Sequence, residues 1–192
     1  MEKDFVEKTL IIFKPDSIKR NLLGEIITRF EKSGLEIKEI KLVYPDREIM
    51  EKHYSDDIKW ITNLGEKTLD FFKETNQFEQ YLASINEMFG TKDPVELGMA
   101  IRVLLIEFML ESPLIVSIWE GSFACSKARK IIGNTIPLNA LPGTIRGDYS
   151  SDSPISLITE GRCIYNLVHA SGDAIEAERE INIWFPQMGI KD

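Results

Sequence analysis

The sequence predicts an α+β fold, in which four strands and the helices packed on them form a ferredoxin-like βαββαβ sandwich that carries a helical insertion. Short apolar runs alternate with segments of helical spacing four times along the chain, an order typical of strands covered by helices. A doubly wound parallel sheet would show the same alternation. The sandwich is favoured because only four strand patterns occur and the second alternates apolar with polar residues, as in a strand buried on one face.

Each element has its own local signal. The first strand is an apolar run that ends before Pro15, which disfavours helix at Lys14 and so leaves Lys14 at the strand end. The first long helix stops at Gly34, and the second strand stops at Pro45. In chain order, the predicted elements are a strand over 8–13, a helix over 22–30, a strand over 35–44, a short helix over 46–54, a strand over 113–119, a helix over 122–132, a strand over 163–170 and a helix over 174–184.

The second half of the chain carries clear helix boundaries. Ser122 is a candidate N-cap, and Gly133 is a typical helix stop. Residues 133–149 contain three glycines and two prolines and predict a long loop. Residues 171–173 are polar or small and cap the last helix.

Two segments interrupt this plan. Residues 55–98 have weak periodicity and several turn signals, and their four lysines and nine acidic residues give a net charge of −5. Residues 150–161 are rich in Ser, Asp, Pro and Gly. We interpret both as insertions into one compact domain that comprises residues 1–192.

Composition and charge exclude several classes of protein. With 43% hydrophobic and 28% charged residues, the chain of 192 residues is globular rather than disordered. A net charge of −8 argues against a general nucleic-acid or membrane-surface binder. Cys125 and Cys163 are too few for a disulfide framework, and the N-terminal residues lack a secretory signal pattern. We therefore expect a soluble cytoplasmic protein with neither a nucleic-acid polymer nor a membrane as partner.

The common nucleotide and metal motifs are absent from the sequence. It has no P-loop, no dinucleotide fingerprint and no paired histidines or cysteines at zinc spacing. His169 instead ends the fourth strand pattern just before a helix, whose free N–H groups favour anions. Residues 122–149 have a net charge of +3, a local cluster of the kind that phosphate binding needs. Taken singly, the histidine is more typical of a half-buried structural residue, and the cluster is equally typical of a solvated helix face.

Four short motifs, in this order, resemble those of the nucleoside diphosphate kinase family. They are residues 12–16 (IFKPD), 119–121 (WEG), 142–148 (PGTIRGD) and 166–171 (NLVHAS). The resemblance covers 8–54 and 99–186. It implies a ferredoxin-like fold and reversible transfer of the γ-phosphoryl group from a nucleoside triphosphate to a nucleoside diphosphate, by a ping-pong mechanism through a phosphohistidine. It also implies Mg²⁺ held mainly by the nucleotide phosphates, with no metal ligand from protein side chains, and a homo-oligomer, either hexamer or tetramer.

The resemblance also assigns roles to individual residues. His169 falls on the phosphorylated histidine, Glu180 on the glutamate that binds its other ring nitrogen, and Lys14 on the lysine near the transferring phosphoryl group. The further matches are Tyr54 and Ser171 beside the histidine, Arg129, Thr135 and Arg146 on the nucleotide phosphates, and Asn166 on the ribose and phosphates. The residue types at these positions suit phosphoryl transfer, because a neutral imidazole is a good nucleophile and the lysine and arginine cations offset phosphate charge.

The sequence departs from the family beside the predicted base site. The short helical hairpin that normally follows His-Tyr, with its stacking aromatic, is replaced by the 55–98 insertion. By register, Ile101 falls where the stacking aromatic is expected and Leu105 where a second apolar contact lies. The insertion offers Trp60, Phe71 and Phe72 as alternatives, although packing of the inserted helices onto each other is the favoured interpretation of these aromatics. Cys163 replaces a usual valine near the base.

Three functions remain to be weighed. An active nucleoside diphosphate kinase is favoured, because Lys14, His169 and Glu180 are all present and a mere binder needs neither the nucleophile nor its carboxylate. The alternative is a catalytically weak nucleotide-binding or regulatory member of the same family. An RNA-binding sheet is disfavoured, because no aromatic RNP-type strand occurs and the charge is negative. Base preference and the role of the insertion stay open.

Overall fold

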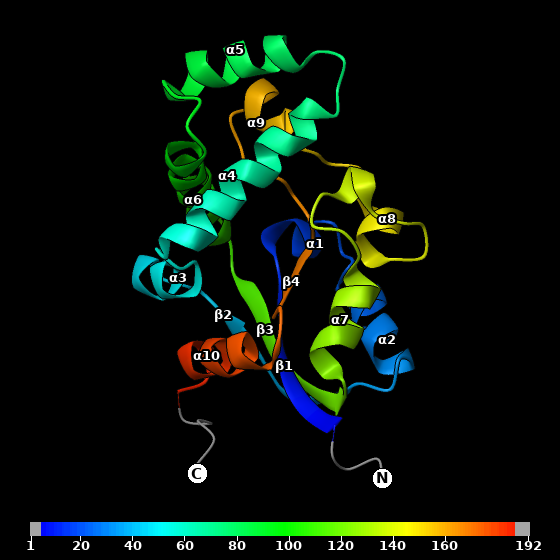
Figure 1. Cartoon of the computed structure of the whole chain (residues 1–192). Helices are drawn as coiled ribbons and strands as arrows, with labels where there is room; N and C mark the ends of the chain where they lie inside the picture. The colour runs from blue at the N-terminus through cyan, green and yellow to red at the C-terminus, as the bar shows by residue number, and fades with distance from the viewer. Residues whose placement is uncertain (1–4, 187–192) are drawn as a thin grey trace.

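The structure is a computed structural model that describes residues 5–186 (Figure 1). Its sheet has the strand order β2-β3-β1-β4, and all the described pairs are antiparallel. The strands are β1 (Val6–Phe13), β2 (Glu36–Val43), β3 (Leu114–Ser122) and β4 (Val168–Ala170). This arrangement confirms the ferredoxin-like α+β sandwich.

The helices cover both faces of this sheet and build a separate layer beyond one end of it (Figure 1). They are α1 (Pro15–Lys19), α2 (Leu23–Lys32), α3 (Arg47–His53), α4 (Ile58–Lys73), α5 (Phe78–Phe89), α6 (Pro94–Leu110), α7 (Ala124–Ile132), the 3-10 helix η2 (Pro137–Asn139), α8 (Ile145–Tyr149), α9 (Ile155–Thr159) and α10 (Ala174–Trp184).

Strand β1 supplies the centre of both hydrophobic layers. Leu10 and Ile12 face one side, where they join residues of α3, α6 and α10. Ile11 and Phe13 face the other side, where they join residues of α2, α7 and α8. All four side chains are fully buried. The uninterrupted apolar run in the sequence therefore reflects a strand covered on both faces.

The two insertions share a third hydrophobic core at the end of the molecule marked by α5 and α9 in Figure 1. Phe72 and Ile85 of the first insertion pack in it with Leu157 of the second. We call this layer, made of α4, α5, the N-terminal part of α6, and α9, the roof. The 55–98 and 150–161 segments are thus one structural unit, although some 50 residues separate them in the sequence.

Two glycines allow the helices α4 and α6 of the roof to pack tightly against each other. A Cβ atom at Gly65 of α4 would lie 1.9 Å from the carbonyl oxygen of Pro94, and one at Gly98 of α6 would lie 2.1 Å from that of Ile61. No side chain fits at either position. Helices α4 and α6 therefore touch backbone to backbone, and α6 continues into the core through Phe108 and Met109.

Several predicted boundaries are wrong. Residue 98, where we expected the first insertion to end, lies inside α6, which runs unbroken from Pro94 to Leu110. Helix α7 begins after Phe123, which has a positive φ of 54°, and Ser122 belongs to β3 instead of capping the helix. The predicted loop over 133–149 contains the short helices η2 and α8, the second capped by the Thr144 hydroxyl.

The fourth strand is much shorter than predicted. Only 168–170 pair with β1, whereas the sequence suggests a strand over 163–170. Leu167 interrupts the extended conformation with a φ of 69°. Its carbonyl accepts from the Lys14 N–H at 2.9 Å, so this part of the chain forms a turn at the end of β1.

Candidate active site

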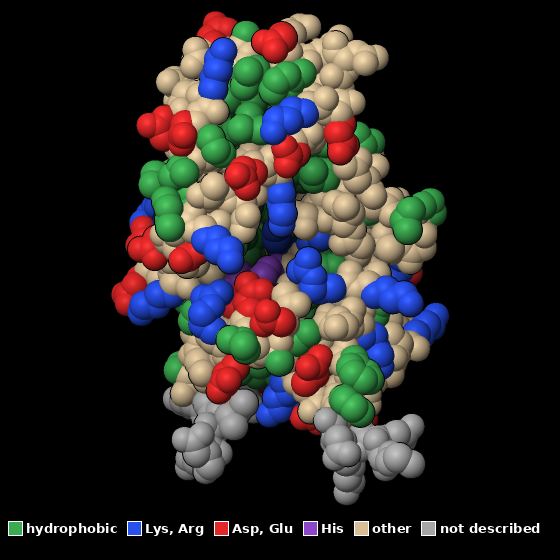
Figure 2. Space-filling model, viewed as in Figure 1, with side chains coloured by type: hydrophobic (Ala, Val, Ile, Leu, Met, Phe, Trp, Pro, Cys, Tyr) green, Lys and Arg blue, Asp and Glu red, His purple; other side chains and the backbone are tan. Residues whose placement is uncertain are grey.

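A cavity of about 500 Å³ lies between the sheet end, the roof and the segment after α7. Figure 2 shows a histidine at the bottom of a hollow with lysine and arginine side chains around it. The predicted site residues that line the cavity are Lys14, Tyr54, Ile101, Leu105, Arg129, Thr135, Arg146, Asn166, His169 and Glu180. Ser171 does not line it and acts from behind, through Glu180.

His169 has one ring nitrogen occupied by a carboxylate. Its Nε2 lies 2.8 Å from Glu180 Oε1 and 3.0 Å from Oε2, and the Ser171 hydroxyl donates to Oε2 at 2.7 Å. Burial alone would raise the pKa of Glu180, but the neighbouring His169 and His53 and the Ser171 hydroxyl lower it to about 2. The ionised carboxylate accepts Nε2–H, and this tautomer leaves Nδ1 as the nitrogen with the free lone pair.

His53 is a second histidine beside the first, and the sequence analysis did not single it out. Its ring packs edge-on against that of His169, with centroids 4.6 Å apart, and Trp184 Nε1 donates to its Nδ1 at 3.3 Å. Burial, followed by the charge of His169, lowers the pKa of His53 to about 3, so the ring stays neutral. The ring also lies near the carboxylate, with its Nδ1 3.5 Å from Glu180 Oε1.

The same three residues also form the group in the described chain that most resembles a metal site. Ligand atoms of His53, His169 and Glu180 lie within 4.8 Å of one another. His53 Nδ1, however, accepts from Trp184, and both Glu180 oxygens lie against His169 Nε2. We therefore interpret these three residues as a hydrogen-bonded group.

Lys14 reaches the cavity from the end of β1. Its Nζ donates to Asn166 Oδ1 at 2.7 Å, and the side chain is almost fully buried. Burial, aided by the charge of Arg146, lowers the pKa of Lys14 to about 8. A poorly solvated ammonium group gains more from a bound anion than an exposed one does.

Arg146 is buried and holds two chain segments together. Its guanidinium donates to the carbonyls of Asn166 at 3.0 Å and Val168 at 2.7 Å, and to those of Gly133 and Asn134 at 3.2 and 3.1 Å. Burial, together with the charge of Arg129, lowers its pKa to about 10. Arg146 thus joins the segment after α7 to the segment that carries His169.

Asp16 fixes the turn before His169, a role that sequence reasoning missed. Its Oδ2 accepts from the Leu167 N–H at 2.9 Å, and burial raises the pKa of this carboxyl group. Leu167 has the positive φ noted above, which is unfavourable for a branched side chain. The position of Asp16 in the IFKPD motif was the available signal, since Pro15 starts a helix that turns Asp16 inward.

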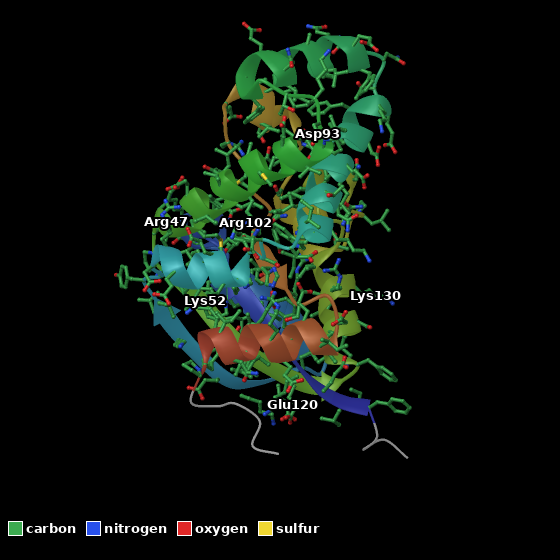
Figure 3. All side chains as sticks on the ribbon, turned by 60° about the vertical axis from the view of Figure 1, so that its left-hand side comes forward. Arg47, Lys52, Asp93, Arg102, Glu120 and Lys130 are labelled. Carbon is green, nitrogen blue, oxygen red and sulfur yellow. The ribbon has the colours of Figure 1, made fainter. Side chains whose placement is uncertain are left out.

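Two groups offer unused hydrogen-bond donors to the cavity. The buried Tyr54 hydroxyl has no partner among residues 5–186. Burial raises its pKa, so it keeps its proton. Arg129 is exposed, and within the same residues its guanidinium forms neither an ion pair nor a hydrogen bond. Lys127 and Lys130 of the predicted positive cluster do not line the cavity, and Lys130 projects outward from α7 (Figure 3).

The apolar part of the cavity comes from several elements. Ile101 and Leu105 of α6 line it beside Cys163, whose pKa is raised to about 12 by burial. Trp60 lines the cavity as well and lies 6.1 Å from the Tyr54 ring. Phe71 and Phe72 pack in the roof core. Of the candidate aromatics from the insertion, Trp60 is therefore the one that lines the main cavity.

The fold, the histidine–carboxylate pair and the surrounding cations define a phosphotransferase that acts on nucleotides. The family model described as nucleoside diphosphate kinase matches residues 7–96 and 102–190. The chain belongs to the nucleoside diphosphate kinase family, and it functions as a nucleoside diphosphate kinase.

Relatives from several organisms agree with this assignment. A nucleoside diphosphate kinase of Pyrobaculum aerophilum is 45% identical over 180 residues, covering 94% of this chain and 95% of the relative. The crystal structure of an NDP kinase from the same organism has a TM-score of 0.87 at 42% identity, covering 97% of this chain and 100% of that one. A transition-state mimic of the Borrelia burgdorferi enzyme, with bound vanadate and ADP, has a TM-score of 0.72 at 32% identity, covering 98% and 92%.

Proposed function

We propose that the kinase works through a phosphohistidine at His169, with Nδ1 as the atom that receives the γ-phosphoryl group. The observation that carries this proposal is the contact of both Glu180 oxygens with Nε2. In the first half-reaction, Nδ1 attacks the γ-phosphorus, the bond to the bridging oxygen breaks, and the nucleoside diphosphate leaves. In the second half-reaction, another nucleoside diphosphate takes the phosphoryl group from Nδ1.

The surrounding residues stabilise the transferred group. Lys14 and the Tyr54 hydroxyl contact the phosphoryl oxygens, and Arg129 and Thr135 bind the phosphates that are not transferred. Arg146 positions both sides of the cleft, and Asn166 contacts the ribose. Ile101, Leu105 and Trp60 contact the base. In-line positioning and charge stabilisation are what phosphoryl transfer chiefly needs from a protein.

Magnesium enters with the nucleotide. The carboxylates that line the cavity are already engaged: Glu180 with His169, Glu176 with the Gly172 N–H at 2.6 Å, and Asp173 as the cap of α10. Because these carboxylates already have protein partners, we propose that the nucleotide phosphates hold the Mg²⁺ ion, which in turn shields their charge.

The proposal is tested by following the label of γ-labelled ATP. With Mg²⁺, the protein acquires phosphate that is acid-labile and base-stable, and GDP removes it as GTP. His169→Ala acquires none. Equal labelling of His169→Ala contradicts the phosphohistidine. Labelling that GDP does not remove favours the alternative, a catalytically weak member of the family.

We also propose a homo-oligomer, either a hexamer or a tetramer, located in the cytoplasm. Apolar residues lie exposed on the edge strand β2, as with Leu42, and in the segment after α7, as with Leu138 and Leu141. These surfaces suit contacts between copies of the chain. Cys125 and Cys163 are both free and buried, which fits a reducing compartment. Among the described helices, the structure contains none of the length and apolarity that crossing a membrane requires.

A further inference from the structure

Helix α4 of the roof turns one face toward the catalytic cavity. Trp60, Asn63, Leu64, Lys67 and Thr68 line it at helical spacing, and each comes from the inserted segment. Among the described residues of 55–98, Lys67 is the charged side chain on this face; the other charges of the segment do not line the main cavity. An insertion with a net charge of −5 thus presents a cation to the catalytic groups.

Lys67 lies where two cavities meet. A neighbouring cavity of about 410 Å³ lies between α4 and residues 133–139. Lys67, Arg129 and Thr135 line both cavities, so the lysine of the roof and the two phosphate-binding candidates of the core share one rim. His169 and Lys14, by contrast, line the main cavity alone. The shared rim is therefore the outer part of the cleft, away from the reacting nitrogen.

The lysines of α4 differ in their partners. Lys73 pairs with Asp70 at 2.7 Å, as is usual for a lysine on a solvated helix face. Lys59 and Lys67 form neither an ion pair nor a side-chain hydrogen bond within residues 5–186, but of these two only Lys67 lines the cavities, beside the equally unpaired guanidinium of Arg129. Two unpaired cations beside one opening attract an anion between them.

We propose that Lys67 binds the non-transferred phosphates of the nucleotide from the roof side, opposite Arg129 and Thr135. This proposal rests on the nucleoside diphosphate kinase activity and adds a residue of the insertion to substrate binding. The triphosphate then reaches from the reacting atom at His169 outward to the rim. There, Lys67 contacts the phosphates from α4, on the side opposite Arg129 and Thr135. The contact involves no base, so it is the same for every nucleotide.

The test compares Lys67→Gln with Lys59→Gln. Lys59 is an exposed lysine of the same helix that lines neither cavity, so its replacement removes the same charge from α4. We expect Lys67→Gln to raise the KM for ATP and for GDP by about threefold to tenfold, the size of one charge-assisted contact near the surface. The kcat value stays within about twofold because the contact is made equally in the ground state and the transition state. Lys59→Gln leaves both constants unchanged.

Two further measurements identify the contacted group. If Lys67 binds phosphate, Lys67→Gln raises the KM by the same factor for ADP, GDP, CDP and UDP. An increase in KM that differs among these nucleotides would show that Lys67 binds the base and would contradict the proposal. The logarithm of kcat/KM falls less steeply with salt concentration in Lys67→Gln than in the wild type. Equal constants for the two variants overturn the proposal while the wild-type activity stands. A wild type that does not transfer phosphate at all overturns the kinase function itself.

Discussion

Lys14 and Arg146 place two buried cations beside the cavity of an acidic protein. Both are buried cations, and burial lowers the pKa of each, Lys14 to about 8 and Arg146 to about 10. Arg146 satisfies its guanidinium with four backbone carbonyls, whereas Lys14 has the single side-chain partner Asn166. Lys14 is therefore the less satisfied charge, and we expect it to gain most from bound phosphate.

This difference predicts a pH dependence. Since the pKa of Lys14 in the free enzyme is about 8, its charge is present below that pH and is lost as pH rises through it. We expect kcat/KM to fall above about pH 8, because this ratio reports the free enzyme. The kcat value holds to higher pH, because bound phosphate favours the charged lysine. Steady-state rates from pH 6 to 10 measure both.

Lys14→Gln supplies the control for this prediction. The variant has a lower kcat/KM at every pH and lacks the alkaline decline between pH 7 and 9. A decline that persists unchanged in Lys14→Gln would show that another group causes it.

At the residue scale, short motifs led to most of the predicted site residues that line the cavity. His169, Lys14 and Asn166 stand in short motifs whose chemistry is legible without coordinates. Asp16 and His53 were missed as site residues because their roles depend on contacts over 151 and 131 positions, with Leu167 and Trp184. The motif that contains Asp16 marked its segment, but a local pattern does not show which distant residue a side chain contacts.

At the element scale, the end of α3 is held by two arginines from other helices. Arg102 of α6 donates to the carbonyls of Tyr54, Ser55 and Glu51 at 2.9–3.2 Å, and Figure 3 shows it beside α3. Arg179 of α10 donates to the Lys52 carbonyl at 3.0 Å. These bonds satisfy the C-terminal carbonyls of a short helix and so position His53 and Tyr54 at the cavity.

Arg102→Gln therefore affects both stability and catalysis. We expect a loss of about 1–2 kcal/mol in the free energy of unfolding, since several charge-assisted bonds to carbonyls disappear. The kcat value falls as well, because His53 and Tyr54 lose their fixed position. Arg47→Gln is the matched control, since Arg47 lies on α3 itself. Its ion pair with Glu107 is exposed, so we expect this substitution to change the free energy of unfolding by less than about 1 kcal/mol. Equal effects of the two changes on kcat would refute a positioning role for Arg102.

The contact of α4 with α6 predicts a steric effect. Gly65→Ala places a methyl group against the Pro94 carbonyl, so the helices must separate. We expect urea denaturation to show a loss of about 1–3 kcal/mol. Gly24→Ala in α2, where nothing lies within 4 Å of the added carbon, costs nothing measurable. A Gly65→Ala protein as stable as the wild type would mean that the two helices are free to separate.

The elements themselves were predictable to different degrees. β1, α2, β2, α7 and α10 follow from periodicity and caps, and their bounds agree with the prediction to within a few residues. The 133–149 segment was predicted as a loop because of its glycines and prolines. In the structure, Thr144 caps helix α8, and the contacts of Arg146 stabilise that helix. The length of β4 was overestimated, because an apolar run in the sequence does not reveal that Leu167 has a positive φ, which interrupts the strand.

At the scale of the whole molecule, two separate insertions behave as one roof over the cleft. Leu157 of α9 is almost fully buried among Phe72, Ile85 and other residues of the first insertion. Their joint core was invisible in the sequence, because weak periodicity in 55–98 gives no hint of which residues a distant segment covers. The roof carries part of the chain's negative charge and still presents Lys67 inward.

Leu157→Ala tests the unity of the roof. Removing this buried side chain is expected to cost about 2–4 kcal/mol. Hydrogen exchange of amides in α5 speeds up accordingly, although α5 lies about 70 residues away in the sequence. Amides of β1 and β3 are less affected. Ile175→Ala, at a residue that is 82% exposed, serves as control and changes neither region. Unchanged exchange in α5 would show that the insertions are independent.

The central claim is that His169 receives the phosphoryl group on Nδ1 because Glu180 holds Nε2. Nuclear magnetic resonance of the protein with ¹⁵N-labelled histidine, after reaction with ATP and Mg²⁺, distinguishes the two phosphorylated nitrogens by their shifts and phosphorus couplings. We expect one phosphohistidine, at His169, with the phosphorus on Nδ1, and its loss on addition of GDP. Phosphorus on Nε2, or on any residue other than His169, would contradict the account.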